Sequence, residues 1–178
     1  LRTQTLQLPH TDCACGKVKI EPLHVLSCKQ LRGRFVRHDA LVAVLRSMFR
    51  EAGFVVRTEV QVIPGSSKRM DLVVYLTTSE LWIDASVVNP TCASYVKSKQ
   101  PACKIRAQQK IAKYQAHANA AGAMFIPAVI EVFGKMGSDL LQCLQRIATG
   151  AYTTLPYPAG SKKNTWIAAY KHRLRHRL

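Results

Sequence analysis

The sequence lacks any apolar run close to the roughly 20 residues that a membrane-spanning helix needs. Its first residues, Leu1 to Pro9, also lack the positive charges followed by an apolar stretch that mark a signal peptide. Neither a membrane anchor nor a secretory leader is therefore expected in these 178 residues. We expect a protein without a membrane partner.

Acidic residues are scarce in the second half of the chain. Residues 85 to 178 hold 14 Lys and Arg against only Glu131 and Asp139, whereas residues 1 to 84 hold 12 against 8 acids. The formal net charge is +16, and repulsion of that size is most easily offset by a phosphate backbone. The basic residues are spread along the chain rather than gathered on one amphipathic helix, which argues against a membrane surface. We expect a nucleic-acid partner.

The order of the hydrophobic patterns predicts the fold class. With 48% hydrophobic residues, the chain can bury the core of one ordinary domain. Helical periodicity and short apolar runs between turns predict helix 37–53, strands 54–63, 71–76 and 81–88, helix 104–121, strand 123–133, and helices 138–149 and 164–175. This order predicts an α/β fold, with a mixed central sheet of about four strands flanked by helices. We expect three parts: a metal-organised segment at 1–33, the α/β domain at 34–150, and a basic linker and helix at 151–178.

Four metal-binding residue types lie close together near the start of the chain. Cys13, Cys15, His24 and Cys28 have the spacing C-x-C-x8-H-x3-C, and such ligands can close a tetrahedron around Zn²⁺. Because the protein fills all four positions, the zinc would be structural. Two alternatives remain at this stage, namely packed thiols without a metal and His10 in place of one ligand.

The other cysteines, Cys92, Cys103 and Cys143, are scattered and are expected to be ordinary thiols. A chain with a full-sized core and this basic charge does not need disulfides, so we expect a reducing, intracellular compartment.

Two aspartates occupy the predicted strands. Asp71 begins one strand and Asp84 lies within the next, so a hairpin can bring their carboxylates together. Two carboxylates that share Mg²⁺ or Mn²⁺ are the minimal apparatus for phosphodiester hydrolysis. Strand alternation puts Asp84 on the same face as Trp82 and Ser86. The alternative is that both aspartates only pair with Lys or Arg.

Six short motifs carry a resemblance to a known family. They are Cys13-x-Cys15-Gly16, His24-x-Leu26-Ser27-Cys28, Arg37-His38-Asp39, Lys68-Arg69-Met70-Asp71-Leu72-Val73, Asp84-Ala85-Ser86-Val87-Val88-Asn89-Pro90 and Lys110-Ile111-Ala112-Lys113-Tyr114. Together, over residues 13 to 134, they resemble the C-terminal end of site-specific non-LTR retrotransposon proteins, where a CCHC zinc knuckle precedes a restriction-endonuclease-like domain.

The resemblance implies a variant of the PD-(D/E)xK nuclease site. Asp71 and Asp84 would hold the metal, and Lys110 with Tyr114 would supply the lysine function, with Lys110 or Lys113 steadying the attacked phosphate. In two places the chain departs from the pattern. Met70 stands where the family usually has Pro, and Ser86 stands where ordinary restriction enzymes have Lys. Glu59 would be either a further metal ligand or a solvated strand residue.

Basic residues outside this motif are expected to contact nucleic acid. They are Lys104, Arg106, Lys171, Arg173, Arg175 and Arg177, and Trp166 or Tyr170 is able to stack on an exposed base. We expect the basic C-terminal segment to be held by such a partner.

Two functions remain open from the sequence. The first is a metal-dependent endonuclease that nicks DNA in the nucleus, which the acid pair favours. The second is a domesticated, non-catalytic RNA-binding component of a ribonucleoprotein such as the mitochondrial ribosome. The basic excess and the absence of reverse transcriptase sequence favour this second function.

Overall fold

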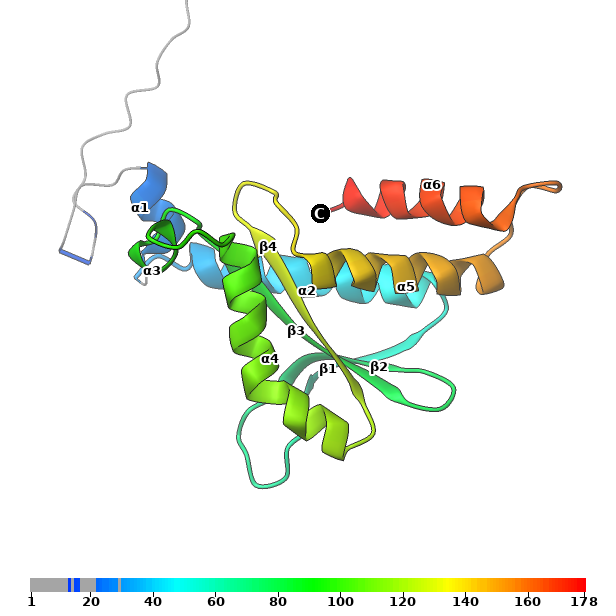
Figure 1. Ribbon diagram of the computed structural model, residues 1–178, viewed down its shortest axis with the longest axis horizontal. Coiled ribbons are helices and arrows are strands. Elements are labelled where there is room, and N and C mark those ends of the chain that lie inside the picture. Colours follow the sequence, from blue (N-terminus) through cyan, green and yellow to red (C-terminus); the bar gives the residue numbers. More distant parts are fainter. Residues whose placement is uncertain (1–12, 14, 17–21, 29) are drawn as a thin grey trace, which may run out of the picture.

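The computed structural model describes residues 13, 15–16, 22–28 and 30–178 (Figure 1). The elements are α1 (Pro22–Ser27), α2 (Gly33–Glu51), β1 (Val55–Val60), β2 (Met70–Tyr75), β3 (Glu80–Val88), α3 (Ala93–Val96), α4 (Ala102–Ala120), β4 (Met124–Glu131), α5 (Ser138–Thr154) and α6 (Lys163–Arg175). The predicted α/β class is confirmed. His10 lies outside the described residues, as does most of the predicted segment 1–33.

The four strands form one mixed sheet in the order β1-β2-β3-β4. The pairs β1-β2 and β2-β3 are antiparallel, as expected for strands joined by tight turns, whereas β3 and β4 are parallel. Parallel neighbours need a long crossover, and α4 provides it (Figure 1). The predicted mixed sheet of about four strands flanked by helices is thus confirmed.

Helices cover both faces of the sheet, so its central strands are buried on both sides. On one face α2 and α5 pack through side chains such as Leu45 and Ile147 against Ile83 of β3. On the other face, Trp82 and Phe125 pack with Tyr114 of α4. Adjacent residues of β3 therefore enter different cores, as its predicted alternation requires.

The C-terminal helix α6 packs on α5, with Leu174 fully buried in the larger core (Figure 1). Arg177, just beyond α6, forms an ion pair with Glu51 of α2. The protein itself therefore holds this segment, and the expectation that an external partner is required for its order is not supported. None of the helices in the described ranges has the length and apolar character needed to cross a membrane.

Candidate functional site

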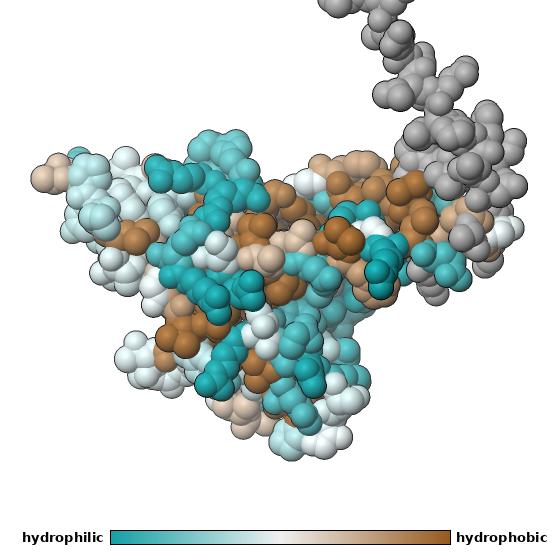
Figure 2. Space-filling view, turned by 180° about the vertical axis from the view of Figure 1, so that it is seen from behind, coloured by the Kyte–Doolittle hydropathy of each residue, from teal (hydrophilic) through white to brown (hydrophobic). Residues whose placement is uncertain are grey.

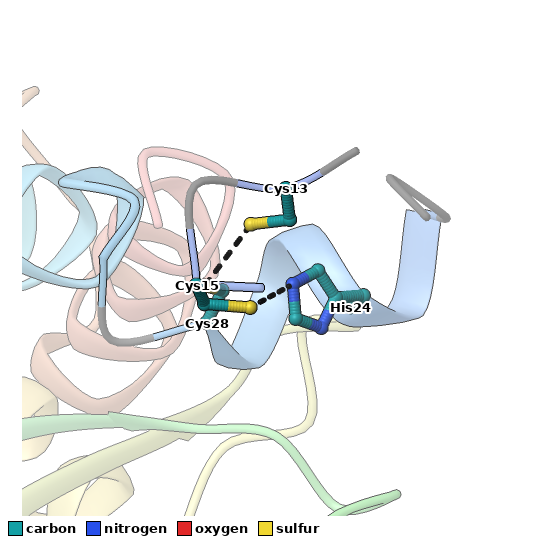
Figure 3. A group of neighbouring side chains, drawn as sticks. All are labelled: Cys13, Cys15, His24 and Cys28. Atoms are coloured by element: carbon teal, nitrogen blue, oxygen red, sulfur yellow. Dashed lines mark hydrogen bonds between the residues drawn. The ribbon is translucent and has the colours of Figure 1, made fainter. Parts of the chain in front are cut away.

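The four predicted zinc ligands converge on one point (Figure 3). Their ligand atoms all lie within 4.8 Å of one another, with Cys13 Sγ 3.5 Å from Cys28 Sγ and Cys15 Sγ 3.4 Å from His24 Nε2. Tetrahedral zinc with Zn–S bonds of about 2.3 Å holds its ligand atoms about 3.8 Å apart. The Cys3His cluster could therefore hold a metal such as zinc.

Local backbone structure explains this convergence. Gly16 has a φ of 69°, and its N–H donates to the Cys13 carbonyl, so the chain turns sharply beside the first two ligands. The Cys28 N–H donates to the His24 carbonyl, which places these two ligands one helical turn apart. Burial raises the pKa of the Cys28 thiol, but N–H groups of Leu31 and Gln30 outweigh it and lower the pKa to about 7. A lowered thiol pKa favours the thiolate that a metal binds.

We call the four ligands and the turn of helix at 22–28 the knuckle. It is docked on the α/β domain. The Asn89 amide donates to Ser27 Oγ at 2.6 Å, and Arg37 of α2 donates to the Leu26 carbonyl at 2.7 Å. Ser27 Oγ also lies 3.4 Å from Cys92 Sγ. All six cysteines are free thiols in the structure.

The two predicted acids lie side by side on adjacent strands. The last registered pair of β2 and β3 is Leu72 with Ile83, and one further step of the same register sets Asp71 opposite Asp84. Both residues are buried, at 8% and 5% exposure. Asp71 Oδ2 accepts hydrogen bonds from the Ala85 N–H at 2.6 Å and from His38 Nε2 at 3.2 Å.

Lys110 completes the group from α4, where it forms an ion pair with Asp84. Burial raises the pKa of Asp84, with a further contribution from Asp71, although the Lys110 ammonium opposes this rise. The hydrogen bond to Asp71 raises the pKa of His38 to about 9, against the effect of partial burial. The geometry therefore places one cation beside each carboxylate at neutral pH.

The other residues of the predicted catalytic set differ in their surroundings. Tyr114 is 4% exposed in the core and its ring lies 5.5 Å from that of Phe125. Lys113 is exposed, its ammonium lies 4.4 Å from the centre of the Tyr114 ring, and its charge acts to lower the pKa of Asp84. Glu59 is an exposed residue with a φ of 54° at the point of β1 that faces Asp71.

A cavity of about 470 Å³ opens beside the acid pair, between α1, α2, the end of β3, α3 and α4. Among the residues that the structure describes, five potentially cationic side chains line it and no carboxylate does; they are Arg34, Arg37, His38, Arg106 and Lys110. Arg106 of α4 donates to Ser86 Oγ at 3.4 Å, so a second cation from this helix approaches β3 close to the acid pair. We call this cavity the cationic pocket.

Sequence reasoning did not assign Arg34, Arg37 or His38 to a site. Arg37 and His38 belong to one of the motifs of the resemblance, but that motif was given no role in a site. The i, i+3 and i+4 spacing of the three residues sets them on one side of a helix, a pattern that also occurs on solvated helices.

The predicted nucleic-acid contacts differ in their surroundings. Lys104, Arg173 and Arg175 are exposed, and Arg106 lines the cationic pocket. Lys171 donates to Gln145 Oε1 at 2.7 Å, and Arg177 is paired with Glu51. When the chain was compared with protein-family models and with curated proteins, no match was found.

Proposed function

We propose that the chain is a nucleic-acid-binding domain with a restriction-endonuclease-like fold, which binds a phosphodiester backbone in the cationic pocket. The observation that carries the proposal is the cationic pocket itself. Its five basic or titratable side chains face the space beside two buried carboxylates, and Lys110 belongs to both groups. A backbone phosphate would offset the repulsion among these side chains.

The fold is compatible with this proposal. The run α2-β1-β2-β3-α4-β4 places the acids on adjacent strands and a lysine on the following helix. A buried nitrogen, Arg37 Nε, also has no hydrogen-bond partner in the described part of the chain. A phosphate oxygen in the cationic pocket would supply an acceptor for it.

The proposed chemistry is metal-dependent phosphodiester hydrolysis. Asp71 and Asp84 supply the hard oxygen ligands that Mg²⁺ or Mn²⁺ prefers, and such an ion, when bound, acts as a Lewis acid and activates water. Lys110 and Arg106 would then neutralise charge on the phosphate oxygens, which is where charge is spread in the reaction. The knuckle closes the cationic pocket on the side of Leu26 and Ser27.

One observation favours the non-catalytic alternative. Each carboxylate already has a cationic partner from the chain, since Lys110 pairs with Asp84 and His38 with Asp71. In an RNA-binding protein that has lost cleavage, these ion pairs would only keep the acids from repelling phosphate.

Cleavage and binding measured together separate the two functions. In the endonuclease proposal, the wild-type chain nicks supercoiled DNA with Mg²⁺ or Mn²⁺, and Asp84→Asn abolishes nicking while nucleic-acid affinity stays equal or rises. Asp139→Asn, which removes a carboxylate on α5 that does not line the cationic pocket, is the matched control and should nick normally. Tight binding of RNA without cleavage under either metal would favour the alternative, and failure to bind both DNA and RNA would refute the proposal.

A further inference from the structure

A second group of side chains lies at the junction of α5 and α6 and has no part in the cationic pocket. The rings of Trp166 and Tyr170 stack with centroids 4.9 Å apart and planes 9° apart, and those of Tyr152 and Tyr157 stack at 4.5 Å and 22°. Tyr152 joins the two pairs, since its ring meets the edge of Trp166 at 5.6 Å. Four of the chain's aromatic residues are therefore in one continuous array.

This array borders an open cavity of about 480 Å³. Pro156, Pro158, Trp166, Tyr170 and Arg173 line it, and we call it the aromatic groove. Its size falls within the range typical of small-molecule sites, and its walls are mainly apolar with a cation at one side. In Figure 2 the end of the molecule that carries the α5–α6 connection is mostly pale around a small hydrophobic patch, with hydrophilic surface beside it.

Among the described residues, cations predominate around the aromatic groove. No acidic residue follows Asp139 in the sequence, whereas Lys162, Lys163, Arg173 and Arg175 are all exposed. Lys163 and Arg173 lie 5.6 Å and 6.0 Å from the ring centres of Tyr152 and Tyr170. Glu51, a carboxylate from α2, is taken by its ion pair with Arg177.

We infer that the aromatic groove binds single-stranded nucleic acid, with a base stacked on Trp166 and Tyr170 and the backbone phosphates on the surrounding lysines and arginines. Aromatic platforms beside cations are how proteins hold single strands without reading their sequence. A proline-rich peptide would also fit the aromatic walls, but it carries no negative charge to pair with the surrounding cations. The inference rests on the proposed function only in the class of partner.

The position of α6 supports a path between the two sites. The helix spans about 20 Å. Arg177 and Leu178, which follow its C-terminal end, line a smaller cavity that Arg37 also lines. Arg37 is also a wall of the cationic pocket. A single strand held in the aromatic groove would therefore run along the basic helix α6 toward the cationic pocket.

Tryptophan fluorescence gives a direct test, because Trp82 is 3% exposed in the core and Trp166 borders the groove. Titration with a short oligothymidylate should quench the Trp166 emission. Tyr170→Ala should weaken binding about tenfold through lost stacking, and Tyr170→Phe should retain it because the ring remains. Arg173→Gln should also weaken binding, whereas Lys135→Gln, which removes an exposed cation outside the groove, should not.

Failure of this inference differs from failure of the proposed function. If the oligothymidylate does not quench Trp166, or if Tyr170→Ala and Arg173→Gln bind it as the wild type does, the aromatic groove is not a single-strand site. Quenching by a proline-rich peptide alone would overturn the inference in the same way. Duplex DNA binding that depends on Arg37 and Arg106 would leave the proposed function standing in each case. Circular dichroism confirms that each variant is folded.

Discussion

At the scale of single residues, two contacts between distant elements hold the candidate site together. Lys110 of α4 pairs with Asp84 of β3, and His38 of α2 pairs with Asp71 of β2. All four side chains are at least partly withdrawn from water, so removing one member of a pair leaves the other without its counter-charge.

Asp84→Asn is expected to lower the free energy of unfolding by about 3 kcal/mol, because the Lys110 side chain is only 12% exposed and its ammonium loses its partner. The double variant Asp84→Asn with Lys110→Met should recover most of this loss. Urea denaturation measures both. Glu51→Gln breaks the more exposed pair with Arg177 and should cost less than about 1 kcal/mol. Equal effects of the two single variants would contradict the buried pairing.

His38 should make stability depend on pH. Its pKa is about 9 in the folded chain, above the ordinary value of 6.5. The stabilisation from the His38–Asp71 pair is therefore complete below pH 6.5, declines as the pH rises, and is lost above about pH 9. Urea denaturation of the wild type and of His38→Gln from pH 6 to 10 should show that the difference in their free energies of unfolding shrinks across this window. A His38 that titrates near 6.5 by NMR would contradict the pairing.

At the scale of elements, periodicity predicted the long helices and the buried strands, because their cores impose regular spacing. The predicted strand 54–63 is shorter in the structure, where β1 ends at Val60 just after the positive φ of Glu59. The single turn α3 was not predicted, since four residues carry no periodic signal. Tyr114 was placed in the site by the Lys-x-x-x-Tyr motif, but the motif does not reveal that this face of α4 packs on Phe125.

The knuckle is expected to bind one zinc ion per chain, as metal analysis would show. Cys15→Ser or chelation should release α1 and the ligand segment, while the α/β domain stays folded because its two main cores contain no knuckle residue. Hydrogen exchange should then rise in 22–28 and remain slow in β2 to β4. Loss of the main cooperative unfolding transition would show that the knuckle is part of the core.

Release of the knuckle by Cys15→Ser or by chelation should also weaken phosphate binding in the cationic pocket. Leu26 and Ser27 form a wall of the cationic pocket, and Arg37 is positioned by the Leu26 carbonyl. The sequence predicts the ligand set of the knuckle from spacing alone, but it does not predict this docking, which depends on contacts such as Asn89 with Ser27 across 62 positions.

At the scale of the whole molecule, charge dominates the expected behaviour. The cationic pocket joins Arg34 and Arg37 with Arg106, about 70 positions later, so no local pattern could predict it. The excess of 26 basic over 10 acidic residues predicts a polyanionic partner, and this stays a prediction that binding measurements must test.

Affinity for duplex DNA or structured RNA should therefore fall steeply with salt. In a plot of log K against log salt, the slope should become less negative by about 0.7 to 0.9 for each phosphate contact that is removed. Arg34→Gln and Arg106→Gln should each do so, and the double variant about twice as much. Lys135→Gln, which removes a cation that does not line the cationic pocket, should leave the slope unchanged. An unchanged slope in the double variant would exclude the cationic pocket from the interface.

The crossover through α4 also sets the order in which the site is assembled. β1, β2 and β3 pair with their neighbours in sequence, whereas β4 joins β3 only after the intervening helix has closed a long loop. Asp71 and Asp84 therefore leave the ribosome, and can enter a hairpin, before Lys110 exists to neutralise Asp84. During synthesis Asp71 already has His38 available as its partner, whereas Asp84 in the nascent sheet lacks its counter-charge until α4 folds over it.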